Sequence, residues 1–207
     1  MSDVIRIEGH GVAGKTSDGH GYVEPDLGWI EVGDKTRYII TAGTIEGLTL
    51  SGDASVEISG GKIERLEGYG KSVVRIEGGT ISTELKVCND CQVIVTGGSI
   101  HYLISWDDSG VTINGIDFAI NGEPIDYGKI TGAFGYVTSA RFPMKLTGTL
   151  QKGDKIDCNI FVTGNSSILL VESEDNFVET TEEIVDDRSF CPGCGDYGNC
   201  NNTCSDD

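Results

Sequence analysis

The chain has 207 residues, and its 33 acidic against 15 basic side chains give a formal net charge of −18. This charge argues against double-stranded nucleic acid as a partner, because phosphate binding requires a basic surface. The chain has no run of about 18 apolar residues for a membrane span, and its first residues lack the basic and apolar regions of a signal peptide, so we expect neither.

The first 35 residues predict an initial coil that carries an inserted loop. Ile7 and Val12 have a five-residue spacing that recurs further along the chain. Ile7 and Ile40 occupy equivalent positions but lie 33 residues apart, which is much longer than one repeat unit. We therefore expect an insertion between Ala13 and Gly28, after which Trp29–Val32 returns to the pattern as a strand.

Residues 36–120 repeat a pattern of about 18 residues, in which apolar residues alternate and then stop at a Gly-Gly pair. The phrase Val74–Ile81 is one copy, and Val56–Ile63 and Val93–Ile100 are altered copies. The apolar residues do not follow the i, i+3, i+4, i+7 spacing of a helix, so the pattern predicts short strands. Three apolar columns recur in register: Ile40, Ile58, Ile76, Val95 and Ile113; Ile45, Ile63, Ile81, Ile100 and Phe118; and Leu48, Leu66, Leu85 and Leu103.

Short strands at a fixed period predict an all-β fold, a single-stranded β-solenoid (parallel β-helix) with coils of about 18 residues. Neighbouring coils would hydrogen-bond about 4.8 Å apart, and the apolar columns would form one continuous core. The Gly-Gly pairs fit corners at which the backbone needs a positive φ or a close approach. These corners explain much of the glycine content of 30 residues.

Past Phe118 the period fades, and the next fifty residues predict a C-terminal β cap. Met144–Leu150 and Ile160–Val162 resemble a hairpin, and Ser167–Val171 reads as a last apolar strand. A cap is expected because the open end of a solenoid otherwise invites edge-to-edge growth.

The composition changes again at Glu172. Residues 172–207 hold 11 acids and one base, Arg188, with few apolar anchors, so they predict an extended acidic arm that ends in a cysteine-rich tail. The predicted organisation is an N-terminal coil with an inserted loop (1–35), solenoid repeats (36–120), a β cap (121–171) and the arm (172–207).

The tail cysteines are the strongest candidate for metal binding. Cys191, Cys194, Cys200 and Cys204 place four sulfurs within 14 residues. Four thiolates suit tetrahedral Zn²⁺, although the central spacer is shorter than in most zinc ribbons. A pair of disulfides suits the same spacing in an oxidising setting, and free or mixed thiols are a third alternative. We expect no required cofactor, with Zn²⁺ at this cluster as the alternative.

A second cysteine pair lies inside the repeats. Cys88 and Cys91 flank two residues at a predicted corner, where they read as a disulfide or redox pair, half of a metal site, or two small corner residues. Cys158 has no neighbouring cysteine in the sequence and is predicted as a buried core thiol. The chain has seven cysteines, an odd number, so at least one is free or paired between molecules.

Other polar residues offer weaker candidates. His10 and His20 stand in near-identical glycine-flanked loops that would suit a divalent metal or be ordinary loop residues. Glu46 and Glu64 would stack one coil apart, as a carboxylate pair for glycoside hydrolysis requires, although surface acids in so acidic a chain also meet by chance. Trp106–Asp108 would place an aromatic ring and two carboxylates at one corner, where calcium or a sugar would fit.

The repeat Ser-Val-x-Ile-x-Gly-Gly-x-Ile, seen at Ser55–Ile63, resembles those of short-coil β-helix surface proteins. These include bacterial exported proteins of the exosortase-sorted type and related phage surface proteins, and the resemblance covers roughly residues 36–171. It implies a β-helix without established catalysis. The chain departs from the exported proteins because it shows no signal peptide and no sorting helix, which favours the phage proteins.

The function expected from these observations is a non-enzymatic structural or attachment module on a virion surface, such as a phage head decoration or fibre component. The acidic arm would dock on, or cross-link to, other copies of the chain or a capsid or surface protein. The first alternative is a secreted bacterial cell-surface or adhesion protein. The second is a carbohydrate-active enzyme, and carbohydrate is a further candidate partner.

Overall fold

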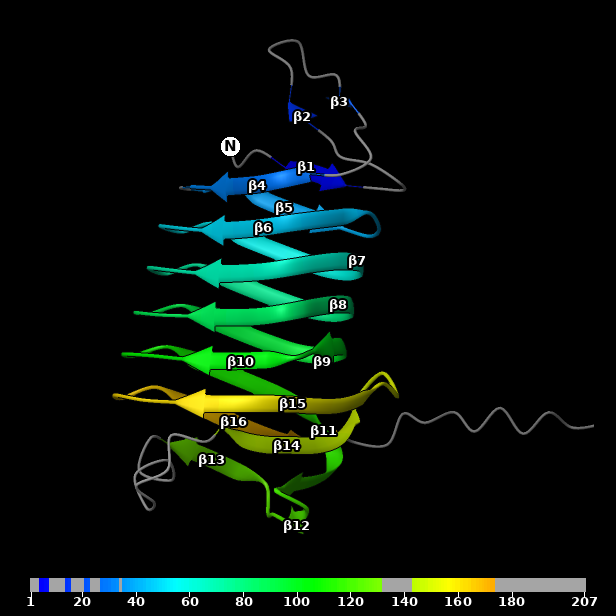
Figure 1. The fold of residues 1–207 in the computed structure, drawn as a ribbon. Coiled ribbons are helices and arrows are strands. Elements are labelled where there is room, and N and C mark those ends of the chain that lie inside the picture. Colours follow the sequence, from blue (N-terminus) through cyan, green and yellow to red (C-terminus); the bar gives the residue numbers. More distant parts are fainter. Residues whose placement is uncertain are drawn as a thin grey trace, which may run out of the picture. The chain divides into compact units, whose positions relative to one another are not determined.

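A computed structural model describes residues 4–7, 14–15, 21–22, 27–33, 35–131 and 143–173, with side chains from Gly28 onward. This part of the chain is an all-β solenoid of about five turns with coils of roughly 18 residues, as the repeat predicts (Figure 1). Within the described ranges, no helix is long and apolar enough to cross a membrane.

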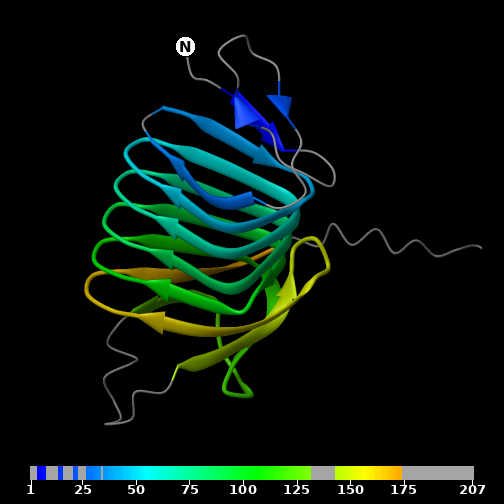
Figure 2. The same cartoon turned by 45° about the horizontal axis from the view of Figure 1, so that its top comes forward.

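Each coil contributes one strand segment to a front face and one to a back face, and equivalent segments of successive coils pair in parallel (Figures 1 and 2). The front face consists of β4 (Leu27–Val32), β6 (Thr44–Leu50), the second halves of β7 (Ser55–Gly68) and β8 (Val73–Val87), β10 (Tyr102–Ser105) and β15 (Lys155–Val162). The back face consists of β1 (Val4–Ile7), β5 (Arg37–Ile40), the first halves of β7 and β8, β9 (Gln92–Ile100), β11 (Gly110–Ile120) and β16 (Ser167–Glu172).

The apolar columns lie inside the coils, as predicted. On the back face, Ile40 pairs with Ile58 and the column continues in register to Ile113. On the front face, Leu48 pairs with Leu66 and that column continues to Leu103. These side chains are buried, and burying each one contributes roughly 1.5–3 kcal/mol before entropy losses.

One predicted column member lies in a different setting. Phe118 is buried, but β11 follows the parallel register of β9 only as far as Ile113. The rest of β11 pairs antiparallel with β14 (Met144–Leu150), which returns from the far end of the chain. Phe118 therefore does not extend the column of Ile45 to Ile100 by parallel pairing, because β14 occupies the position beside this part of β11.

The Gly-Gly pairs form one of the two corners, and each glycine has its own reason. At the first position the backbone lies against the preceding coil: a Cβ on Gly78 would lie 2.5 Å from the Ser59 carbonyl oxygen. At the second position the backbone is left-handed, with φ of 80° at Gly79. A glycine is thus needed for close approach and then for a positive φ.

The other corner, between the front and back faces, uses a different solution. Its turn residue has a positive φ in successive coils, and asparagine and aspartate replace glycine there at Asn89 and Asp107. Two residues later the chain turns inward and buries a small side chain. These inward residues are Ala54, Ser72, Cys91, Ser109 and Ser166.

The strands on either side of the expected N-terminal insertion take the positions that the repeat assigns to them. Ile7 of β1 pairs with Ile40, and the chain returns in β4, where Ile30 pairs with Leu48. Between these strands, β2 (Gly14–Lys15) and β3 (Gly21–Tyr22) pair antiparallel as a separate two-stranded sheet. The first coil is thus interrupted, and β1 and β4 still take the positions that the repeat assigns to them.

At the C-terminal end, the predicted hairpin forms from β14 and β15, but β15 and β16 also build one more parallel coil. Leu103 pairs with Ile160, and Ile113 pairs with Leu170, so the apolar columns extend beyond the recognisable repeats. Antiparallel strands then end the stack: β14 on β15, and β13 (Gly128–Thr131) on β16, while the short β12 (Glu123–Pro124) pairs with β11. The segment predicted as a cap therefore contains both a coil and its covering strands.

The close approach at the Gly-Gly corner gives a direct test of the fold. Gly78→Ala should lower the free energy of unfolding by about 2 kcal/mol or more, because the new methyl group meets the Ser59 carbonyl. The matched control is Gly28→Ala on β4, where a Cβ would meet nothing within 4 Å. Urea unfolding of both variants checks this, and equal stabilities would contradict the proposed packing.

Candidate functional site

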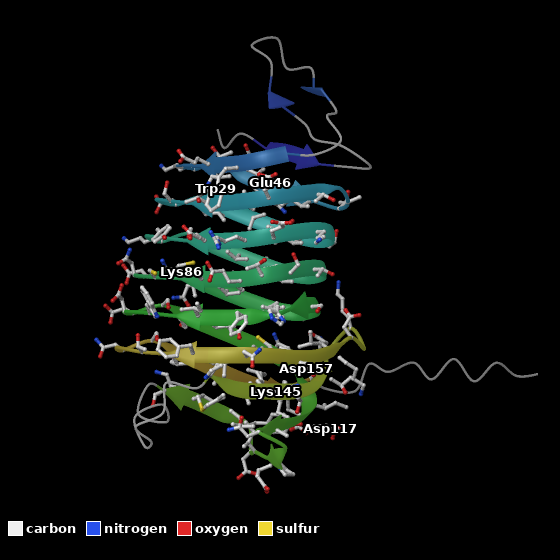
Figure 3. All side chains as sticks on the ribbon, in the orientation of Figure 1. Trp29, Glu46, Lys86, Asp117, Lys145 and Asp157 are labelled. Carbon is white, nitrogen blue, oxygen red and sulfur yellow. The ribbon has the colours of Figure 1, made fainter. Side chains whose placement is uncertain are left out.

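The exposed apolar side chains gather on the front side of the solenoid. Among the described residues, six large apolar side chains are exposed, and four of them belong to front-face strands or to the corner after β10. They are Trp29, Tyr102, Trp106 and Phe161; the other two are Tyr127 and Leu169. Trp29 stands apart near the N-terminal end, where its indole NH donates a hydrogen bond to the Thr49 hydroxyl at 2.9 Å (Figure 3).

Three of these side chains and one isoleucine lie at neighbouring outward positions, here called the aromatic patch: Tyr102, Ile104, Trp106 and Phe161. Tyr102 and Ile104 on β10, and Trp106 directly after it, alternate with the buried Leu103 and Ser105, so all three point outward. Phe161 on β15 pairs in register with Ile104, which places its ring beside the isoleucine on the next coil. The patch therefore spans two coils at the C-terminal part of the front face.

Lys86 borders the patch on the preceding coil. Its ammonium lies 4.9 Å from the centre of the Trp106 ring and 5.9 Å from that of Tyr69. The Tyr69 hydroxyl donates to Glu67 at 2.9 Å. Desolvation would lower the pKa of Lys86, but the charges of Tyr69 and Glu67 outweigh it and raise that pKa. Lys86 is thus held as a cation against the tryptophan ring.

Acids and an amide border the patch at the corner. Asp107 takes the left-handed turn position, and Asp108 accepts a hydrogen bond of 3.0 Å from the Asn165 side-chain amide on the next coil. The structure thereby brings Trp106 together with both predicted acids and adds Asn165. In the described ranges, no group of three or more His, Cys, Asp or Glu residues is arranged to hold a metal ion.

Cys88 and Cys91 lie at a corner, as predicted, and both are free thiols in the structure. Cys91 points inward, and the Ser72 hydroxyl donates to its sulfur at 3.2 Å. Burial raises the pKa of Cys88 and raises that of Cys91 to about 11, so both thiols are un-ionised at neutral pH. Cys91 fills an inward position of the corner column, and a disulfide or redox role for the pair stays a prediction. Cys158 is a fully buried core thiol.

The four tail cysteines, Cys191, Cys194, Cys200 and Cys204, lie outside the described residues, as do His10 and His20. Zinc and disulfides therefore both remain predictions for the tail. Glu46 and Glu64 are exposed at matching positions of neighbouring coils, since the residues on either side of them pair in register. The structure thus brings this pair together as the period predicts.

A shallow hollow of about 500 Å³ lies elsewhere, along the Gly-Gly corner, and Glu77, Ser99 and Asp154 are among its lining residues. Its charged groups are already engaged: Lys152 pairs with Glu77 at 2.6 Å, and Asp154 accepts a hydrogen bond from the Gly98 backbone at 2.6 Å. These contacts fasten the β14–β15 turn to the corner, which gives the hollow a structural explanation.

Sequence reasoning singled out Trp106 but missed the rest of the aromatic patch. The sequence does indicate part of it, because Tyr102 and Ile104 alternate with the inward column residues and must therefore face outward. Phe161 could not be predicted from the sequence, because its coil lies beyond the recognisable repeats and its pairing with Ile104 depends on the returning hairpin.

Comparisons of the chain with family models, with curated proteins and with solved structures give no match.

The buried thiols predict an alkaline loss of stability. Burial raises the pKa of Cys91 to about 11 and that of Cys158 to about 12, whereas an exposed thiol ionises near pH 9. Between pH 9 and 11 the unfolded chain therefore releases protons that the folded chain keeps. Each thiol should lower the free energy of unfolding by about 1.4 kcal/mol per pH unit in this window.

Urea unfolding at several pH values, comparing the wild type with the Cys91→Ala/Cys158→Ala variant, measures this effect. The variant should be less stable at pH 8 because of lost packing, but its stability should fall less steeply above pH 9. Parallel pH profiles would contradict the assignment of these thiols as buried and un-ionised.

Proposed function

We propose that the chain is a non-enzymatic structural or attachment module on the surface of a larger assembly, with a virion surface as the setting. The supporting observation is the way the stack is built and ended. Buried apolar columns run through the coils, and antiparallel strands β13 and β14 close the C-terminal end. A capped rod of this kind holds its surface rigid and does not extend itself by edge pairing at that end.

The dimensions fit a spacer or display element. Seven strand segments stack on the back face from β1 to β16, which corresponds to about 29 Å along the solenoid axis. The setting on a phage head or fibre rests on the resemblance of the repeats. The same rod would also serve an extracellular adhesion protein, which is the alternative setting.

The charge distribution gives the arm its role. Residues 172–207 carry −10 of the net charge of −18, and four of the seven cysteines. In this proposal the acidic arm docks on other copies of the chain or on a capsid or surface protein with a basic surface. The four cysteines then lock the contact through disulfides or Zn²⁺.

Removal of the arm tests this role. Strand β16 runs to Glu172, and the Ser173 backbone NH donates to Gly115 at 3.2 Å, so the truncation should begin at residue 174. The truncated chain should keep the β circular dichroism and unfolding midpoint of the full chain but lose its assembly, measured by light scattering. Unchanged assembly would refute a docking role for the arm.

The full-length Cys191→Ser/Cys194→Ser/Cys200→Ser/Cys204→Ser variant is the matched control. It keeps the acidic charge and removes only the sulfurs, so it separates electrostatic docking from locking. Loss of assembly in this variant assigns the contact to the cysteines, and treatment of the wild type with a chelator or with a reductant then distinguishes Zn²⁺ from disulfides.

A further inference from the structure

The proposed function gives a role to the arm but none to the aromatic patch on the front face. We propose that the aromatic patch of Tyr102, Ile104, Trp106 and Phe161 is a binding site for a neutral polysaccharide. This inference rests on the proposed function, because it names the class of target to which an attachment module would bind.

The shape of the patch suits an extended, flat ligand. Tyr102, Trp106 and Phe161 are 37%, 38% and 42% exposed, so a large part of each ring meets solvent. Tyr102 and Ile104 lie on β10 and Trp106 follows at the corner, over a length of about 13 Å, and Phe161 lies one coil away. Because the backbone is fixed in a stacked sheet, the rings are arranged before a ligand arrives, which lowers the entropy cost of binding.

The chemistry of the patch matches both surfaces of a sugar ring. The C–H faces of a pyranose are apolar and stack on aromatic rings, which combine a large apolar area with an electron-rich face. The hydroxyl edges need hydrogen-bond partners, and the corner offers the Asp107 and Asp108 carboxylates and the Asn165 amide. An apolar platform bordered by such groups gives affinity through the rings and orientation through the edge.

Lys86 is a positioning residue for the patch. Its ammonium lies against one face of the Trp106 ring at 4.9 Å, and a contact of this kind is worth about 0.5–1 kcal/mol at an exposed site. The lysine holds the tryptophan side chain in place at the edge of the patch. Figure 3 shows Lys86 on the front face, on the coil that precedes β10.

Charge selects a neutral ligand. Among the described residues, the acids Glu67, Asp107 and Asp108 lie around the patch together with the cation Lys86, and the whole chain carries −18. Anionic polysaccharides and nucleic acids would be repelled by this border. A second copy of the chain would bring the same acidic border to the contact, which disfavours a symmetric dimer through the patch.

The test uses the tryptophan in the patch as its own probe. The chain has two tryptophans, so Trp29→Phe leaves Trp106 as the sole indole. Titration of this variant with soluble glucan, mannan, xylan and galactan, followed by indole fluorescence, should give a saturable change with at least one of them. Affinity electrophoresis in gels that contain the same polysaccharide should show retardation that persists in 0.5 M NaCl.

The location is tested by single substitutions in the full chain, each checked for β circular dichroism. Phe161→Ser and Tyr102→Ser should weaken binding at least tenfold. Leu169→Ser is the matched control, because Leu169 is 40% exposed on β16 of the back face, and it should bind as the wild type does. Equal losses in patch and control variants would overturn the assignment of the site.

Three further outcomes of these experiments would count against a polysaccharide site at the aromatic patch. Failure to bind any neutral polysaccharide in the panel, or binding only to anionic ones such as alginate, would overturn the proposal. Loss of assembly in Phe161→Ser without any polysaccharide binding would assign the patch to a protein contact instead. Assembly that depends on the arm, together with a patch that binds no polysaccharide, would leave the proposed function standing and refute this inference alone.

Discussion

The structure depends on in-register backbone pairing between coils, which requires each coil to repeat the path of the one before it. The Gly-Gly corner is where this requirement is most severe, because Gly78 lies against the Ser59 carbonyl and Gly79 takes a left-handed conformation. Only the absence of a Cβ permits both at low cost. Once the corners repeat, the apolar columns fall into register, and the core forms as their continuous stack.

The same pairing determines the outer surface. Because side chains alternate along a strand, burying Leu103 and Ser105 obliges Tyr102, Ile104 and Trp106 to face solvent. Stacking then aligns outward residues of neighbouring coils, so that Lys86, Ile104 and Phe161 lie in one row, from which Lys86 reaches over the Trp106 ring. A rigid core and a preorganised surface patch are therefore two consequences of one periodicity, which is why a solenoid suits display and attachment.

Among the described residues, several buried polar side chains lie at or next to the second corner, where they hydrogen-bond to one another and to turn carbonyls. Ser105 and Ser109 exchange a hydroxyl hydrogen bond of 2.8 Å, and Ser166 donates to the Ser105 carbonyl at 2.7 Å. Cys91 takes the equivalent inward position two coils before Ser166, which explains why a thiol that looks like half of a pair in the sequence is a packing residue. The position requires a small side chain, and at Ser109 and Ser166 the hydroxyl also donates to a turn carbonyl, that of Trp106 and of Thr163 respectively.

Periodicity alone was sufficient to predict the β-solenoid, its apolar columns and the interrupted first coil, because those features depend on residues that recur at matching positions, such as Ile58 and Ile76. It also placed Glu46 beside Glu64 and Cys88 with Cys91 at a corner. Folding in three dimensions decided the rest: β14 takes the place expected for a continuation at Phe118, and β15 brings Phe161 to Ile104 from 57 residues away in the chain. Such contacts carry no local signal, because they follow from how a returning hairpin pairs with a strand edge that exists only once the coils have stacked.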